Sequence, residues 1–284
     1  MRPRRGRRRL EPPHPDLPKA PTMLTTRYVS GSPNWLDLGT PDIGAAREFY
    51  ADLFGWTFVP AGPEAGGYGM FQLDGETTAA GMPLAPDQGH PAWSVYFQSP
   101  DIDATAEAVR QGGGAVLHGP MDIWDQGRMA YFADPSGASF GCWQPNRNKG
   151  LDRVGAEGAL CWTELYTPDE SAALAFYTAV LGWGTSSMPF PDGSGSYTMV
   201  HPASAGPDAM FGGLVPLAAT GGTTPHWLPY FAVRDCDATV TRARSGGGSA
   251  LTPAVDLQGV GRFATLTDPA GARFAVMQGE PQDG

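Results

Sequence analysis

The segment NWLDLGTPD at residues 34–42 recurs as CWTELYTPD at residues 161–169, an offset of 127 residues. The same offset brings LFGW at residues 53–56 onto VLGW at residues 180–183. Ordered matches at one fixed spacing are the mark of an internal duplication. We therefore predict two homologous domains in this chain.

Farther along the chain the offset between matching segments becomes 134 residues. Trp93 then matches Trp227, and DPSG at residues 134–137 matches DPAG at residues 268–271. An insertion of seven residues in the second copy accounts for the change of offset. We predict a basic, disordered N-terminal extension at 1–32, domain 1 at 33–146, a linker at 147–158, domain 2 at 159–279 and a tail at 280–284.

Local signals predict the same order of elements twice in each domain. Asp42 follows a short apolar strand and can cap a helix that ends at Gly55. Apolar residues at helical spacing lie between these two positions. Further strands are predicted at 56–59, 68–73, 77–84, 93–98, 115–118, 129–133 and 139–144, with a second helix at 102–111. Each domain is thus expected to be strand, helix and three strands, repeated once.

This repeated βαβββ pattern, with its Leu-Gly-Trp helix ends and Asp-Pro-x-Gly turns, resembles the vicinal oxygen chelate superfamily. That superfamily includes glyoxalases, bleomycin resistance proteins and extradiol dioxygenases. The resemblance covers residues 33–279. It implies an α+β fold in which four βαβββ modules form two half-open mixed β-barrels with flanking helices. In the metal-dependent members, it also implies a divalent metal held by His and Glu side chains.

The positions that match the family's metal ligands carry other side chains in this sequence. They are Trp35, Ser94 and Gly141 in domain 1 and Trp162, Leu228 and Ala275 in domain 2, with Ala80 or Met82 and Gly213 or Val215 on the fourth strands. None of these offers a donor that a divalent cation prefers. We expect no metal and no other cofactor. The alternative is that the alignment is shifted by two residues. Asp37, Glu164 and His226 would then be candidate metal ligands.

Two carboxylates and one imidazole are the candidate catalytic groups. Strand alternation puts Asp37 on the same face as Trp35, and Glu164 on the same face as Trp162. Burial beside an indole raises the pKa of a carboxyl group, as a general acid or base requires. His226 is expected to face Glu164 and to move a proton. The alternative is that the carboxylates accept structural hydrogen bonds and that His226 bonds to a loop.

Flat and flexible apolar side chains, together with two arginines, are the candidate ligand contacts. They are Trp35, Trp93, Trp124, Trp162, Trp227, Met70, Met199, Arg128 and Arg262. Such side chains suit an aromatic ligand, and an arginine can pair with its carboxylate or phenolate. The alternatives are that the apolar residues belong to the core and that the arginines pair with Asp125 or Asp256.

Charge and composition narrow the class of partner. Residues 1–22 carry seven basic and two acidic residues, whereas residues 23–284 carry 12 basic and 27 acidic ones. The acidic folded part argues against nucleic acid and anionic membranes as partners. Three unpaired cysteines are typical of the reducing cytoplasm. We expect a cytoplasmic monomer or homodimer that binds a small molecule.

Three functions remain open on the sequence alone. The first is a metal-independent enzyme that rearranges, cyclises or dehydrates a hydrophobic oxygenated molecule, such as an aromatic polyketide, by acid–base chemistry. The second is a non-catalytic protein that binds a drug or toxic metabolite and confers resistance. The third is a metal-dependent glyoxalase or dioxygenase with displaced ligands.

Overall fold

The computed structural model describes residues 24–85, 89–190, 195–220, 222–257 and 259–280. Most of the predicted disordered extension therefore lies outside the described residues. Its last residues, 24–32, pack against the folded part. The Tyr28 hydroxyl donates to the Leu151 carbonyl (2.7 Å), and the Gly31 N–H donates to the Gln98 carbonyl (2.8 Å).

Domain 1 forms a mixed sheet of eight strands with two α-helices. Its elements are β1 (Pro33–Thr40), α1 (Ile43–Phe54), β2 (Thr57–Pro60), the 3-10 turn η1 (Pro63–Ala65), β3 (Gly69–Leu73), β4 (Glu76–Pro83), β5 (Ala92–Gln98), α2 (Ile102–Gln111), β6 (Ala115–Ile123), β7 (Gly127–Ala133) and β8 (Ser139–Pro145). The strand order is β2-β3-β4-β1-β5-β8-β7-β6. The first strands of the two modules, β1 and β5, are therefore antiparallel neighbours at the centre.

Domain 2 repeats this arrangement in a second mixed sheet. Its elements are β9 (Leu160–Thr167), α3 (Glu170–Leu181), β10 (Trp183–Pro189), β11 (Ser196–Pro202), η2 (Pro207–Ala209), β12 (Gly212–Pro216), η3 (Leu217–Thr220), β13 (His226–Ala232), α4 (Cys236–Ser245), β14 (Ser249–Ala250), β15 (Val255–Leu257), β16 (Gly261–Thr267) and β17 (Arg273–Gly279). The order is β10-β11-β12-β9-β13-β17-β16-β14, with β15 also paired to β16. The predicted α+β class and the tandem modules are confirmed, and each sheet is open at its two edge strands.

The helices begin and end where the sequence predicts. The Asp42 carboxylate accepts from the Ala45 N–H at the start of α1, and Gly55 ends the helix at φ 75°. Asp169 and Gly182 do the same for α3. An Asp cap satisfies free N–H groups of the first turn, and glycine reaches the left-handed conformation without steric cost.

One strand is longer than predicted. The sequence places its end near residue 118, whereas β6 continues to Ile123. Its pairing with β7 shifts register twice, between Val116 and His118 and between His118 and Met121. Because β6 is an edge strand, Pro120 removes no hydrogen bond from a central ladder. In domain 2 the corresponding segment is split into β14 and β15.

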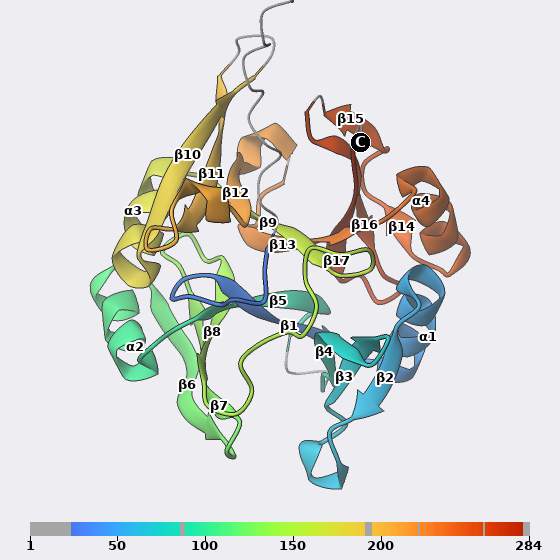
Figure 1. Ribbon diagram of the computed structural model, residues 1–284, viewed down its shortest axis with the longest axis horizontal. Coiled ribbons are helices and arrows are strands. Elements are labelled where there is room, and N and C mark those ends of the chain that lie inside the picture. The colour runs from blue at the N-terminus through green and yellow to red at the C-terminus, as the bar shows by residue number, and fades with distance from the viewer. Residues whose placement is uncertain (1–23, 86–88, 191–194, 221, 258, 281–284) are drawn as a thin grey trace, which may run out of the picture.

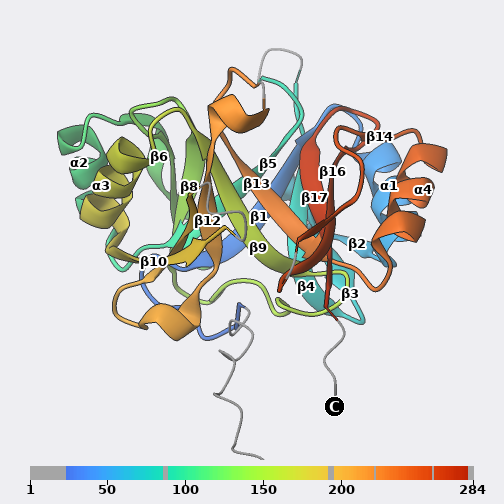
Figure 2. The same cartoon turned by 90° about the horizontal axis from the view of Figure 1, so that it is seen from above.

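The two sheets pack back to back, with the helices at the flanks (Figures 1 and 2). Rings of β5 and β13 meet in the middle, where the Phe97 and Trp227 centroids lie 5.1 Å apart and those of Trp93 and Phe231 lie 5.4 Å apart. Figure 2 shows α2 beside α3 on one flank and α1 beside α4 on the other, so each pair takes one helix from each domain. We call this packed side of each sheet its helix face.

Two hydrogen-bond chains tie the domains together with approximate two-fold symmetry. Trp93 Nε1 donates to the Tyr50 hydroxyl (3.0 Å), which donates to Asp268 in the other domain (3.3 Å). The second chain runs from Trp227 to Tyr177 (3.0 Å) and on to Asp134 (3.2 Å). Buried polar groups are costly unless they are paired, so these chains fix the register of one domain on the other.

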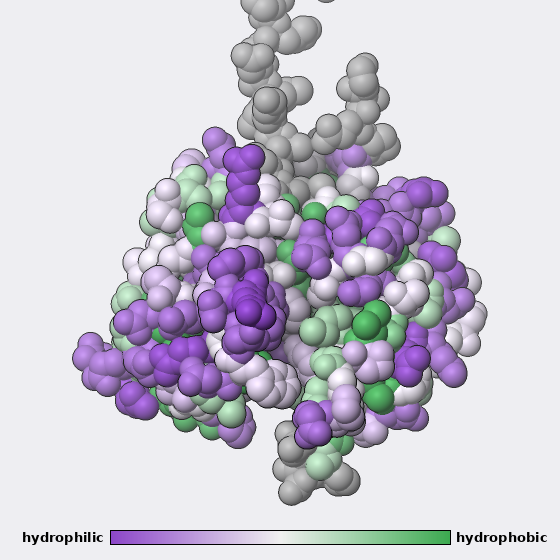
Figure 3. All heavy atoms as spheres, turned by 60° about the horizontal axis from the view of Figure 1, so that its bottom comes forward, coloured by the Kyte–Doolittle hydropathy of each residue, from purple (hydrophilic) through white to green (hydrophobic). Residues whose placement is uncertain are grey.

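Hydrophilic residues cover most of the face seen in Figure 3, and hydrophobic residues appear there in small separate groups. Among the described residues, no helix is long and apolar enough to cross a membrane. The three cysteines, Cys142, Cys161 and Cys236, are buried free thiols.

Candidate active site

Asp37 lies on the face of the domain 1 sheet that is opposite the helix face. Its Oδ1 accepts hydrogen bonds from Trp35 Nε1 (2.9 Å) and from the Tyr68 hydroxyl (2.8 Å), and the Tyr96 hydroxyl also bonds to this carboxylate. Asp37 is only 9% exposed. We call Trp35, Asp37, Tyr68 and Tyr96 the first cage, and the side of each sheet that carries its carboxylate the carboxylate face.

Strand register explains how the first cage assembles. On the β1–β5 ladder Trp35 lies opposite Tyr96, and Asp37 lies opposite Ser94. Tyr96 in turn lies beside Gly141 of β8. A Cβ on Gly141 would stand 2.1 Å from the Tyr96 ring, so only glycine lets that ring lie across the sheet.

Glu164 occupies the matching position in domain 2. Its Oε1 accepts from the Tyr197 hydroxyl (2.7 Å), and its Oε2 accepts from the hydroxyls of Tyr230 (2.5 Å) and Tyr166 (3.0 Å). Trp162 Nε1 donates to the Tyr197 hydroxyl (3.0 Å). We call Trp162, Glu164, Tyr197 and Tyr230 the second cage, with Tyr166 at its edge.

Burial and hydrogen bonding act in opposite directions on both carboxylates. Burial raises the pKa of Asp37 and of Glu164, and the hydrogen bonds that they accept offset part of that rise. Burial and the neighbouring carboxylates also raise the pKa values of the cage tyrosines, so their hydroxyls stay protonated. These tyrosines are Tyr68, Tyr96, Tyr197 and Tyr230. Each cage is therefore a titratable carboxyl group among neutral phenol donors.

His226 lies at the edge of the second cage and does not touch Glu164. Its ring stacks on Tyr166, with centroids 4.7 Å apart and planes 9° apart. Nδ1 lies 2.9 Å from the Thr224 carbonyl, the loop contact of the alternative prediction. Burial lowers the pKa of this imidazole, which favours its neutral form. His226 therefore supports Tyr166, which donates to Glu164.

The candidate ligand residues fall into three places. Trp35 and Trp162 belong to the cages. Met70 and Met199 lie on the carboxylate faces. Met70 pairs with Ala80, which pairs with Asp37, and Met199 pairs with Gly213, which pairs with Glu164. Trp93 and Trp227 point to the helix faces and pack in the core between the domains, whereas Trp124, at the β6–β7 turn, is 70% exposed.

The two arginines form surface ion pairs. Arg262 bonds to Asp237 (2.9 Å) and to Asp256 (2.8 Å), the second of which the sequence suggests. Arg128 instead bonds to Asp103 and Asp122, because Asp125 pairs with Arg147 (2.7 Å). None of these ion pairs involves Asp37 or Glu164.

The donor set at the cages does not fit the family's metal. A glutamate at position 141 would collide with the Tyr96 ring, and a Cβ on Gly213 would stand 2.2 Å from the Tyr197 hydroxyl. Each carboxylate is surrounded by phenol and indole groups that donate hydrogen bonds to it. Within the described part of the chain, no three His, Cys, Asp or Glu side chains lie close enough together to hold an ion.

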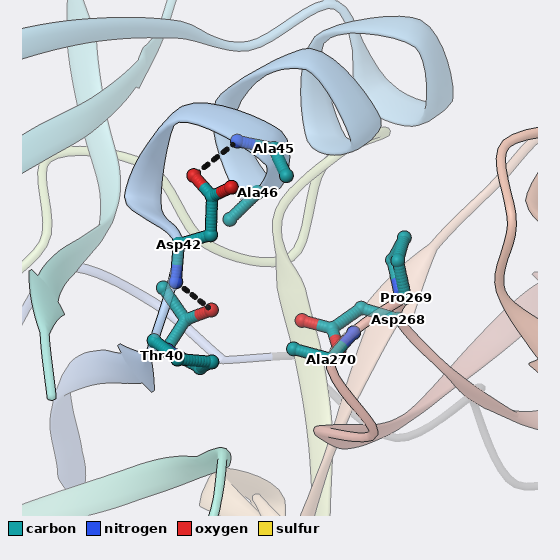
Figure 4. Close-up of a pocket in the computed structure, with 8 residues that line it drawn as sticks. Thr40, Asp42, Ala45, Ala46, Asp268, Pro269 and Ala270 are labelled. Atoms are coloured by element: carbon teal, nitrogen blue, oxygen red, sulfur yellow. Dashed lines mark hydrogen bonds between the residues drawn. The ribbon is translucent and has the colours of Figure 1, made fainter. Parts of the chain in front are cut away.

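Two surface pockets lie away from the cages. One, of about 190 Å³, lies where α1 of domain 1 meets the Asp268 turn of domain 2 (Figure 4). Its acidic groups are already engaged, because Asp42 caps α1 and Asp268 accepts the N–H groups of Ala270 and Ala272. The other, of about 340 Å³, lies between residues 24–32 and the β11–β12 connection. We assign no chemistry to either.

The tyrosines of the cages are not among the residues that the sequence pattern predicts for the site. Tyr96 and Tyr230 match at the offset of 134, so a search for repeated polar aromatics finds them. Tyr68 and Tyr197 are 129 residues apart, inside the region where the offset changes. No fixed-offset comparison pairs them, and only the folded sheet brings them to the carboxylates.

Comparison with known proteins identifies related sequences along most of the chain. A family model described as the Glyoxalase/Bleomycin resistance protein/Dioxygenase superfamily matches residues 32–141 and 159–276. Anthracycline biosynthesis protein DnrV of Streptomyces peucetius is 42% identical over 268 residues, which covers 89% of this chain and 95% of DnrV. The protein CFP32 of Mycobacterium tuberculosis is 43% identical over 264 residues, 90% of this chain and 98% of CFP32.

Solved structures share the fold at low sequence identity. The Mn(II)-bound glyoxalase of Novosphingobium aromaticivorans has a TM-score of 0.59 at 16% identity, over 88% of this chain and 83% of that one. The 2,3-dioxygenase LapB of Pseudomonas sp. KL28 has a TM-score of 0.58 at 14% identity, over 89% of this chain and 95% of that one. These likenesses concern the fold alone.

Proposed function

Because the chain belongs to the glyoxalase/bleomycin resistance protein/dioxygenase superfamily, we propose that it is an acid–base catalyst of that fold which needs no metal. Its substrate is a hydrophobic, oxygenated small molecule of the aromatic polyketide class. The observation that carries the proposal is a carboxyl group in each domain that is bonded to phenols and whose pKa burial raises. The relationship to anthracycline biosynthesis proteins supports the substrate class.

The proposed chemistry is proton transfer at carbon. The ionised carboxylate takes a proton from a carbon next to a ketone, and the C–H electron pair moves to form an enolate. A neutral cage tyrosine donates a hydrogen bond to the enolate oxygen and stabilises the developing charge. Return of the proton at another atom completes an isomerisation. In a dehydration the carboxyl group gives the proton to a β-hydroxyl, the C–O bond breaks, water leaves, and the enolate electrons form the new C=C bond. A raised carboxyl pKa suits both steps, because the group must accept the proton and then release it.

Metal independence rests on the kind of donors present. In a metal-dependent relative the cation polarises the substrate oxygen, and here phenol hydroxyls take that role in our proposal. We also place the protein in the reducing cytoplasm, with which three buried free thiols are compatible.

The test is turnover of an anthracyclinone that carries an enolisable ketone, followed by mass spectrometry. Wild-type protein is assayed before and after exhaustive chelation, beside the double variant Asp37→Asn, Glu164→Gln. We expect turnover that survives chelation and is lost in the double variant. Loss on chelation with recovery on adding Mn²⁺ would contradict the proposal. Tight stoichiometric binding without product would favour the sequestering alternative.

A further inference from the structure

A linker lies across one end of the domain 1 sheet. It leaves β8 after residue 145 and reaches β9 at residue 160. Three contacts fix it along that end: Trp143 Nε1 to the Asn148 carbonyl (2.9 Å), the Leu151 N–H to the Asn34 carbonyl (3.0 Å) and the Asp152 N–H to the Thr77 carbonyl (2.8 Å). The linker thus runs from β8 past β1 to β4.

Exposure of the two carboxylate faces differs accordingly. In domain 1, Trp35 and Tyr96 are each 6% exposed, and Trp143 is 7% exposed. Their counterparts at the offsets of 127 and 134 are Trp162, Tyr230 and Met277. Of these Tyr230 is buried, whereas Trp162 and Met277 are partly exposed, as is Glu164. Tyr68 of the first cage and Tyr197 of the second are both partly exposed, so the second cage is the more open of the two at its carboxyl group and tryptophan.

An apolar row lies next to the second cage on the carboxylate face. Val255 pairs with Phe263 across β15 and β16, and Phe263 pairs with Met277 across β16 and β17. Phe263 and Met277 are partly exposed, and Val255 is 40% exposed. The Phe263 ring lies 6.2 Å from the ring of Tyr230, a donor to Glu164. The row thus leads from the sheet edge to the carboxyl group.

We propose that the chain has one ligand site, on domain 2, where the row of Val255, Phe263 and Met277 is a platform for a flat oxygenated aromatic molecule. At the matching place on domain 1 the innermost residue, Trp143, is buried and bonded to the linker, so the row there ends short of Asp37. A planar ring system gains contact area from a phenyl ring and a thioether on an adaptable apolar surface. The carbonyl or hydroxyl oxygens of the ligand lie at the end of the platform near Tyr230, where they contact the phenols around Glu164. The proposal rests on the function proposed above, for which it names the binding surface.

The duplication supplies a matched control for two residues of the platform. Phe263 corresponds to Met129, and Val255 corresponds to Met121, at the offset of 134. The probe is 1,8-dihydroxyanthraquinone, titrated into the full-length protein by isothermal titration calorimetry. We expect one saturable site per chain, and in Phe263→Ala an affinity about tenfold weaker, because a ring contact is lost. Met129→Ala should bind as wild type does.

A second pair of variants guards against misfolding. Val255 and Met121 are both exposed, at 40% and 48%, so Val255→Ser and Met121→Ser leave the core intact. Only Val255→Ser should lower the affinity for the probe. Two equal sites per chain, no saturable binding, or equal losses in the matched variants would overturn the proposal. Binding is measured without turnover, so a wrong platform is distinguishable from a wrong catalytic role for Glu164.

Discussion

The first and second cages are built from the same kinds of residue and differ in how far they are closed. Each holds one carboxyl group among two tyrosines and a tryptophan from matching strands. Asp37 is the shorter acid and is buried, whereas Glu164 reaches one methylene farther and is partly exposed. The comparison teaches that one copy of a duplicated site can be packed into the core while the other stays more open, and our proposal assigns the chemistry to the more open copy.

The largest expected difference between the cages is in turnover. Glu164→Gln should lower turnover of the anthracyclinone about 100-fold or more, which is the scale of a lost general base. Asp37→Asn should leave it within about threefold of wild type, because our proposal places the substrate at the second cage. The assay is initial rate by mass spectrometry. Equal losses in the two variants would mean that both cages work.

Stability should rank the same two variants in the opposite order. Asp37→Asn leaves one acceptor oxygen for the three donors Trp35, Tyr68 and Tyr96, and leaving a buried donor unpaired costs about 1–3 kcal/mol. Glu164→Gln should cost less than about 1 kcal/mol, since water can reach the partly exposed group. Urea unfolding at neutral pH measures both. A larger loss in Glu164→Gln would reverse our assignment of roles.

The pH dependence of stability tests whether burial raises the pKa of the cage carboxyl groups. Burial raises the pKa of Asp37 above its ordinary 3.8, so the folded chain binds this proton more tightly than the unfolded chain does. Its contribution to the free energy of unfolding is then greatest below pH 3.8 and is lost as pH rises through the raised folded value.

Wild type should therefore lose stability relative to Asp37→Asn as pH rises, when urea midpoints are measured from pH 3.5 to 7. The matching difference for Glu164→Gln should have the same sign. Burial is the cause of the shift at both carboxyl groups. A flat difference for Asp37→Asn would show that burial does not raise this pKa.

The smallest effect concerns the edge of the second cage. His226 stacks on Tyr166, whereas the first cage has Ala92 and Gly39 at these positions. His226→Ala should cost about 0.5–1.5 kcal/mol of stability, the value of an aromatic contact. It should lower turnover less than about tenfold, because Tyr166 stays bonded to Glu164 but loses its support. His226→Phe should restore both. A loss as large as in Glu164→Gln would instead make His226 a proton donor or acceptor itself.

The sequence predicts the fold well because each copy of the repeat contains the same local signals for helix starts and ends. Caps such as Asp42, stops such as Gly55 and the two offsets locate the modules without any tertiary information. Strand alternation also correctly placed Trp35 beside Asp37 on one face.

The rest depends on how distant segments meet. Tyr68 and Tyr197 come from third-strand segments whose spacing the insertion disturbs, and the closure of the first cage depends on the path of the linker over Trp143. From the sequence alone, Trp93 and Trp227 are as suitable for a ligand contact as Trp35 and Trp162 are. Back-to-back packing of the sheets buries them between the domains.

Deuterium uptake tests most directly whether the Glu164 carboxyl moves a substrate proton without a metal. Metal-stripped wild type, Asp37→Asn and Glu164→Gln are incubated in D₂O with an anthracyclinone that carries an enolisable ketone, and the mass of the recovered molecule is followed. Wild type and Asp37→Asn should introduce deuterium next to the ketone, and Glu164→Gln should not. Uptake by Glu164→Gln at the wild-type rate, or uptake by wild type only after a divalent cation is added, would contradict the account.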